Sequence, residues 1–132
     1  MDSLNTSAGA VWCVVDAKEL PATSFPVFTD VRDVANIHVL ATTEDIAKGQ
    51  SYLSIAGHFD NSQIVEIIAR HFPEQKHRLP KVDKVEVPEH FATDSSKVEK
   101  QLGIKWIPFE QSIVDTAKSL FALEAKLKEE QK

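Results

Sequence analysis

The stretch PVFTDVRDVANIHVLA, residues 26–41, does most to decide how this chain folds. Val27 and Phe28 are bulky and apolar, as at the end of a buried strand. Thr29 or Asp30 can cap a following helix, and Asp33 adds a carboxylate in its first turn, near the positive end of the helix dipole. The stretch therefore predicts a short strand that runs into a helix. One face of this helix should be mostly apolar, because the following residues recur at near-helical spacing: Val31, Val34, Ala35, His38 and Ala41.

The rest of the chain also alternates between predicted strands and predicted helices. We expect strands at residues 10–15 (AVWCVV), 51–56 (SYLSIA), 91–93 and 104–107. Asp60 and Gln63 form a capping-box pattern before a helix that ends ahead of Pro73, and residues 73–89 read as an irregular, charged segment. Asp94 should cap a short helix that Gly103 stops, and Pro108 should open the last helix. This order predicts an α/β fold of mixed strands and helices in a single domain, residues 1–132.

Composition limits the function. The chain has 132 residues, enough for one domain with a real core. Its net charge of −5 argues against nucleic acid or an anionic membrane as the main partner, because both require clustered Lys and Arg. The single cysteine, Cys13, excludes an intrachain disulfide, suits a reducing compartment and is expected to be a small buried side chain. No apolar run reaches the ~18 residues of a membrane span and no signal-peptide pattern opens the chain, so we expect a cytoplasmic protein.

The chain carries neither a glycine-rich phosphate-binding loop nor a Tyr-x-x-x-Lys pair. A dinucleotide fingerprint needs clustered glycines after a strand, whereas Gly9, Gly49, Gly57 and Gly103 are scattered. The only tyrosine is Tyr52, and the residue four positions later is an alanine, so a Tyr-x-x-x-Lys pair is absent. We therefore assign no catalytic residue from these 132 residues.

Other kinds of active site also lack support. The histidines are not paired at a metal-binding helical spacing and the cysteine is distant, so we expect no metal site. No Gly-x-Ser-x-Gly elbow supports a hydrolase. His38, on the expected apolar helix face, reads as a hydrogen-bonded core or interface histidine, and His71 and His77 as solvent-facing side chains.

Four segments together resemble the C-terminal portion of an extended short-chain dehydrogenase/reductase, in the NAD-dependent epimerase/dehydratase superfamily. The resemblance is to the dihydroflavonol-reductase-like and fungal methylglyoxal-reductase-like ketoreductases, and it runs over nearly the whole chain. Each segment alone is weak, but their order and spacing also fit. They are LNTS at 4–7, PVFTDVRDVANIHVLA at 26–41, AGHFDNSQIVEIIARHFPE at 56–74 and DSSKVEKQLGIKWIPFEQSIVDTAKSLFALE at 94–124.

The resemblance implies NADPH-dependent reduction of aldehydes or ketones. In that family an N-terminal Rossmann half carries the glycine motif, a catalytic serine, the tyrosine that protonates the carbonyl oxygen and the lysine that lowers the pKa of that tyrosine. The C-terminal part adds the substrate-pocket lid and a few cofactor contacts. The serine of the LNTS-like segment lies near the cofactor, and Ser7 matches it, next to the LNTS asparagine Asn5.

Three hypotheses follow. The chain is a truncated, reductase-derived polypeptide that binds NADP weakly or not at all and needs a Rossmann half to act on a carbonyl substrate. Alternatively, it is a piece of a working oxidoreductase. A third reading, from another class, is a small protein-interaction module derived from the reductase fold, which binds a protein partner through exposed apolar surface.

Overall fold

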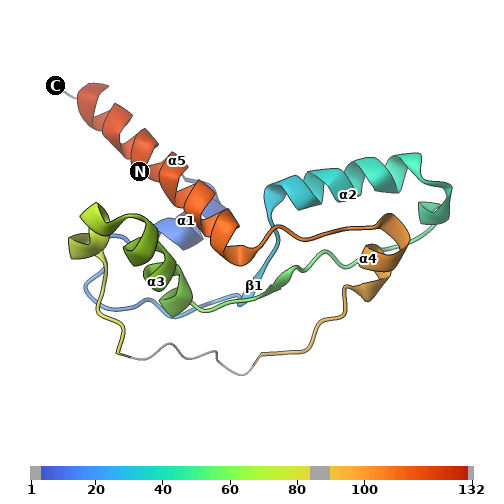
Figure 1. Ribbon diagram of the computed structural model, residues 1–132, viewed down its shortest axis with the longest axis horizontal. Coiled ribbons are helices and arrows are strands. Elements are labelled where there is room, and N and C mark those ends of the chain that lie inside the picture. Colours follow the sequence, from blue (N-terminus) through green and yellow to red (C-terminus); the bar gives the residue numbers. More distant parts are fainter. Residues whose placement is uncertain (1–3, 84–89, 131–132) are drawn as a thin grey trace. The chain divides into compact units, whose positions relative to one another are not determined.

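The structure is a computed structural model, and it describes residues 4–83 and 90–130 (Figure 1). Part of residues 73–89, the expected irregular segment, lies outside the described residues. The chain forms two compact units. The first is built from the described parts of Met1–Ser24, Asp60–Val87 and Glu110–Lys132, and the second from those of Phe25–Phe59 and Pro88–Phe109. Helices and strands are both present, as the sequence predicts.

The first unit is helical. It contains α1 (Thr6–Trp12), α3 (Asn61–His71), the 3₁₀ helix η2 (Pro73–Arg78) and nearly all of α5 (Phe109–Glu130). The Asp60–Gln63 capping box forms as predicted, and α3 ends just before Pro73. The apolar side chains that this unit buries come from α1 and the turn after it, from α3 and from α5: Val11, Val14, Val15, Ile64, Val65, Ile67, Ile68, Ile113, Ala117 and Leu120.

The second unit contains β1 (Val27–Phe28), α2 (Val31–Thr43), the 3₁₀ helix η1 (Asp45–Ala47), β2 (Gly57–His58) and α4 (Ser96–Leu102). The two strands pair antiparallel, with Val27 opposite His58 and Phe28 opposite Gly57. A Cβ atom at Gly57 would lie 2.9 Å from the Phe28 ring, so this glycine lets the ring pack on the ladder. The core of the unit joins α2, η1, α4 and the segment after α4: Ile37, Ala47, Val98, Leu102 and Ile104, with Leu40, Tyr52 and Trp106 packed against it.

The strand–helix unit at 26–41 is confirmed, but the mostly apolar face that the spacing predicts is not the face that the helix buries. Asp30 is the N-cap of α2, and its side chain accepts a hydrogen bond from the Arg32 amide at 2.9 Å. The helix buries Asp33 and Ile37, whereas Val31 is 77% exposed. Asp33 turns inward because its carboxylate accepts a hydrogen bond from the backbone amide of Ile107 at 2.9 Å. The side of α2 that faces inward is therefore determined by a hydrogen-bonded polar side chain and not by the apolar spacing.

The strand predicted at 10–15 is also wrong, because most of that run continues or ends α1. Asn5 caps the helix by accepting a hydrogen bond from the Ala8 amide at 2.8 Å, and two strong helix formers, Ala8 and Ala10, follow it. Cys13 is the C-cap of this helix and is exposed, not buried.

The other three predicted strands are not formed. Residues 51–56, 91–93 and 104–107 are irregular. In the first of them, the carbonyls of Ser54 and Ile55 accept hydrogen bonds from the side chains of Thr29 and Ser95 instead of from a neighbouring strand. The ladder is limited to the two residues that follow this segment.

Helix boundaries near the C-terminus follow the predictions closely. Gly103 has φ +65° and ends α4, and α5 begins directly after Pro108. Asp94 lies one position ahead of the cap residue, Ser95, and its carboxylate accepts a hydrogen bond from the Ser96 amide at 2.9 Å. Within the described ranges, no helix has both the length and the apolar character needed to cross a membrane.

Candidate functional site

Ser7, the residue that the sequence assigns to a cofactor contact, lies in the first turn of α1 and is exposed. Its neighbour Asn5 is committed to capping the helix. The Ser7 hydroxyl has no hydrogen-bond partner among the residues that the structure describes. It is therefore free to contact a bound molecule from the surface of the first unit.

The strand–helix and loop–helix turns do not fit the phosphates of a dinucleotide. Asp30 places a carboxylate at the N-terminus of α2, and Asp60 does the same at α3. These carboxylates accept the amide hydrogen bonds that a pyrophosphate would need and would repel its charge. Gly57 is used to pack against Phe28, and Gly9 lies inside α1. The described residues therefore offer NADPH one candidate contact, Ser7, and no phosphate cradle.

Tyr52 packs against the core of the second unit. Its hydroxyl donates a hydrogen bond to the Gln101 side chain at 2.9 Å, and the Lys97 ammonium lies 5.2 Å from the centre of its ring. The lysine itself donates to the Ser51 carbonyl at 3.0 Å. Because both groups are occupied locally, this Tyr–Lys contact binds elements together and does not resemble a proton-donating pair.

Arg78 is the centre of an ion-pair and aromatic cluster in the first unit. Its guanidinium donates to Asp16 at 2.9 Å and to Glu124 at 2.8 Å, and lies 5.6 Å from the ring centre of Trp12. It is also 5.9 Å from the ring centre of Phe121. The hydrogen bonds to Asp16 and Glu124 raise the pKa of Arg78 further, and those from Arg78 lower the pKa of each carboxyl group. The cluster ties the turn after α1 and η2 to α5.

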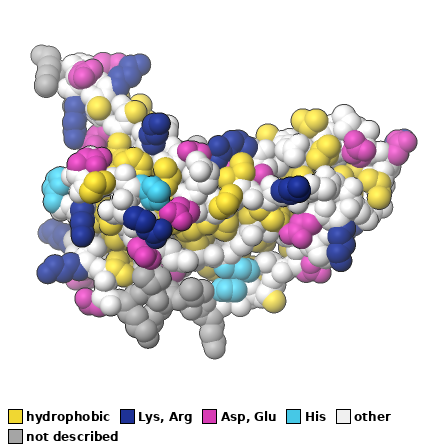
Figure 2. Space-filling model, viewed as in Figure 1, with side chains coloured by type: hydrophobic (Ala, Val, Ile, Leu, Met, Phe, Trp, Pro, Cys, Tyr) yellow, Lys and Arg dark blue, Asp and Glu magenta, His cyan; other side chains and the backbone are white. Residues whose placement is uncertain are grey.

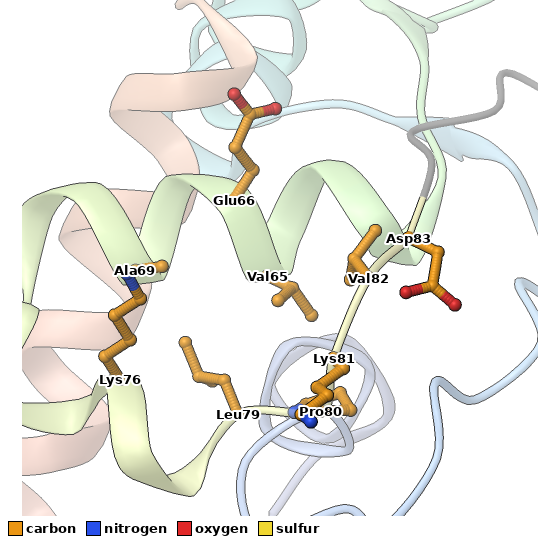
Figure 3. A pocket seen from close by; sticks show the side chains of 9 residues that line it. All are labelled: Val65, Glu66, Ala69, Lys76, Leu79, Pro80, Lys81, Val82 and Asp83. Atoms are coloured by element: carbon orange, nitrogen blue, oxygen red, sulfur yellow. The ribbon is translucent and has the colours of Figure 1, made fainter.

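A pocket of about 460 Å³ lies beside α3 in the first unit (Figure 3). Val65 and Ala69 of α3 form one wall, and the segment 79–83 forms another. Figure 3 shows the Glu66 carboxylate directed away from the other lining side chains; Glu66 also pairs with Arg70 at 3.5 Å. A pocket of this size can hold a small molecule, but its lining offers no tyrosine, serine or cysteine. The full lining is Val65, Glu66, Ala69, Lys76, Leu79, Pro80, Lys81, Val82 and Asp83.

In the second unit two histidines stack. The rings of His58 and His90 lie 3.6 Å apart and nearly parallel, and Phe91 meets His58 edge-on at 5.9 Å. Phe91 in turn contacts Phe25 at 6.4 Å, and both of these phenylalanines are exposed. Parallel rings cannot aim their nitrogens at one ion between them. Across residues 4–83 and 90–130, no three His, Cys, Asp or Glu side chains gather as metal ligands.

Sequence reasoning missed the Arg78 cluster, the pocket and the histidine stack. Arg78 lies 62 residues from Asp16 and 46 from Glu124, so no local pattern joins them. The predictions for His38, His71 and His77 are partly confirmed, because all three side chains are exposed. His71 and His77 face solvent as expected, and His71 contacts Glu110 at 2.7 Å. His38 is hydrogen-bonded as expected, to the Val34 carbonyl at 2.7 Å, but it is exposed and so lies outside the core.

No family model matches the chain. Individual proteins do. An uncharacterized oxidoreductase of Schizosaccharomyces pombe is 30% identical over 93% of this chain and 37% of its own length. A cinnamoyl-CoA reductase of Medicago truncatula is 35% identical over 89% of this chain and 35% of its own length.

Solved structures agree. The yeast methylglyoxal/isovaleraldehyde reductase Gre2, complexed with NADPH, matches with a TM-score of 0.82 and 28% identity. The match covers 95% of this chain and 38% of the yeast protein. The chain thus spans little more than a third of the length of these three proteins. In sequence and in fold, it corresponds to the C-terminal portion of an extended short-chain dehydrogenase/reductase.

Proposed function

We propose that this chain forms the substrate-side part of an NADPH-dependent reductase of small aldehydes or ketones, with residues 1–132 acting as one functional part. The observation that carries the proposal is the match of almost the whole chain to one portion of a reductase solved with NADPH. The names of that protein's substrates, methylglyoxal and isovaleraldehyde, support a small carbonyl compound as the substrate class.

The chain by itself is not expected to catalyse the reaction. Its helix N-termini at α2 and α3 are occupied by Asp30 and Asp60, and Tyr52 is bonded to Gln101. The phosphate cradle and the proton donor therefore have to come from a cofactor-binding part, either in the same polypeptide or in another. A reducing compartment such as the cytoplasm suits the free thiol of Cys13.

Two measurements test whether the chain needs a cofactor-binding part in order to catalyse the reaction. First, NADPH is titrated into the purified chain and followed by its fluorescence, and its oxidation is followed with an aldehyde present. We expect no saturable binding and no turnover. Second, this chain replaces the matched C-terminal portion of the yeast reductase in a chimera, which should oxidise NADPH when given methylglyoxal or isovaleraldehyde.

Either of two results would overturn the proposal. One is aldehyde reduction by the isolated chain. The other is a chimera that melts cooperatively and binds NADPH but reduces neither aldehyde.

Ser7 is proposed as the cofactor contact of this part. Ser7→Ala in the chimera should weaken NADPH binding about two- to tenfold, the effect of one lost hydrogen bond, with a smaller effect on kcat. Ser119→Ala, at another exposed serine in a helix of the first unit, is the matched control and should change neither value. Equal NADPH affinity in the Ser7→Ala chimera and its parent would remove Ser7 from the cofactor site.

A further inference from the structure

One face of α2 is exposed and carries no charged side chain. It consists of Val31, Ala35, His38, Val39 and Thr42, which fall on one side of the helix at 3.6 residues per turn; all are exposed, Val31 by 77% and Val39 by 59%. We call these five residues the α2 face. It lies opposite the side of the helix that buries Asp33 and Ile37. Figure 2 shows hydrophobic side chains at the surface over this helix.

The lack of charge extends along most of the helix. Residues 34–43, VANIHVLATT, contain no Asp, Glu, Lys or Arg. Ile46, in the 3₁₀ helix that follows, is another large apolar side chain and is 53% exposed. The solvent side of a surface helix normally carries charged and polar groups. The α2 face therefore has the composition of a covered surface.

Another helix of the same chain shows the contrast. The exposed side of α5 carries Lys118, Lys126, Lys128, Glu129 and Glu130. Its one strongly exposed large apolar residue, Leu123, is 40% exposed. The chain thus has the usual charged pattern where a helix faces water, and α2 departs from it.

His38 adds a polar group within the α2 face. Its Nδ1 lies 2.7 Å from the Val34 carbonyl, so this nitrogen carries the proton and donates. In the neutral ring Nε2 is then left as a hydrogen-bond acceptor. A covering surface with apolar side chains and one suitably placed donor would match this face.

We infer that the α2 face is the surface on which the cofactor-binding part of the reductase docks. The inference rests on the proposed function and names the partner surface for it. Its occupant follows from the comparisons: nearly all of this chain matches solved reductases, but it accounts for only 38% of the length of the yeast enzyme. The remaining part of such an enzyme is therefore available to cover an uncharged helix face that these 132 residues leave open.

The test compares one substitution in two settings. Val39→Lys adds a charge at an exposed position, so in the isolated 132-residue chain the melting temperature should change by no more than about 2 °C. In the chimera with the cofactor-binding part of the yeast reductase, the same lysine would be buried without a partner. There we expect a fall in melting temperature of about 5 °C or more, because an unpaired buried charge costs several kcal/mol. Leu123→Lys, on α5, is the matched control and should be tolerated in both settings.

The outcomes separate the docking surface from the proposed function. If Val39→Lys lowers the melting temperature only in the chimera, the docking surface is supported, even if the chimera reduces no aldehyde. Equal tolerance of Val39→Lys in an active chimera overturns the docking surface and leaves the proposed function standing. A chimera that never melts cooperatively overturns the assigned occupant. Dimerisation of the isolated chain in sedimentation, abolished by Val39→Lys, would assign the face to a second copy instead.

Discussion

Arg78 is the residue on which the packing of the first unit depends most. Its side chain is only 14% exposed, yet it is charged, pairs with two carboxylates and contacts two aromatic rings. Planar, bidentate contacts of this kind suit a guanidinium and not an ammonium group. Removing it would leave Glu124, whose side chain is 16% exposed, without its main cation.

We expect Arg78→Lys to destabilise the chain by roughly 2 kcal/mol and Arg78→Ala by roughly 3 kcal/mol, the scale for breaking a largely buried ion pair. Urea unfolding followed by circular dichroism measures both. Arg70→Lys is the control, because Arg70 is 54% exposed in its pair with Glu110, and it should cost less than about 1 kcal/mol. Equal effects at the two arginines would contradict a special role for the cluster.

The same cluster predicts how stability depends on pH. Hydrogen bonds from Arg78 lower the pKa of Glu124 and of Asp16 in the folded chain. The unfolded chain therefore binds more protons in mild acid, so this contribution is present above the unfolded pKa values, near 4, and is lost as pH falls through the folded ones. Melting temperatures between pH 7 and pH 3 should fall more steeply for the parent chain than for Glu124→Gln. Parallel curves would show that Arg78 does not perturb this carboxyl group.

At the scale of elements, capping chemistry was predictable and burial was not. Asp30, the Asp60–Gln63 box and Gly103 act through neighbours within three residues, so the sequence alone identifies them. The inward face of α2 depends on Asp33 accepting from Ile107, which lies 74 residues away. The helix α1 was missed because the Asn5 cap and the alanines at 8 and 10 outweigh a short β-branched run. Ser7 could be proposed only through resemblance, and the Arg78 cluster depends on contacts between distant segments.

Two glycines, one at the end of α4 and one inside α1, predict stability changes of opposite sign when replaced by alanine. Gly103 stops α4 at φ +65°, so Gly103→Ala should cost about 1 kcal/mol through backbone strain, although no atom blocks the new methyl group. Gly9 lies inside α1 with open space around it, so Gly9→Ala should stabilise the chain by about 0.5–1 kcal/mol. Thermal melts of both variants give the comparison. A stabilising Gly103→Ala would mean that this helix does not end in the left-handed conformation.

For the whole molecule, the two compact units should respond differently when the cofactor-binding part is joined. The first unit is held by the capped and well-buried α3 and by the Arg78 cluster, which these 132 residues supply in full. In the second unit, the ladder has only two residue pairs, and the backbone amides of Tyr52 and Leu53 have no partner among the described residues. Local opening is easiest where few backbone groups are paired and apolar side chains face water.

Hydrogen exchange measured by mass spectrometry on the isolated chain and on the reductase chimera tests this expectation. Peptides from α2 and from residues 51–56 should exchange at least about tenfold more slowly in the chimera, because a docked surface must leave before those amides open. Peptides from α3 serve as the internal reference and should change little, since their protection comes from contacts already present in the isolated chain. If exchange becomes slower in α3 but not in α2, the docking surface lies on the first unit.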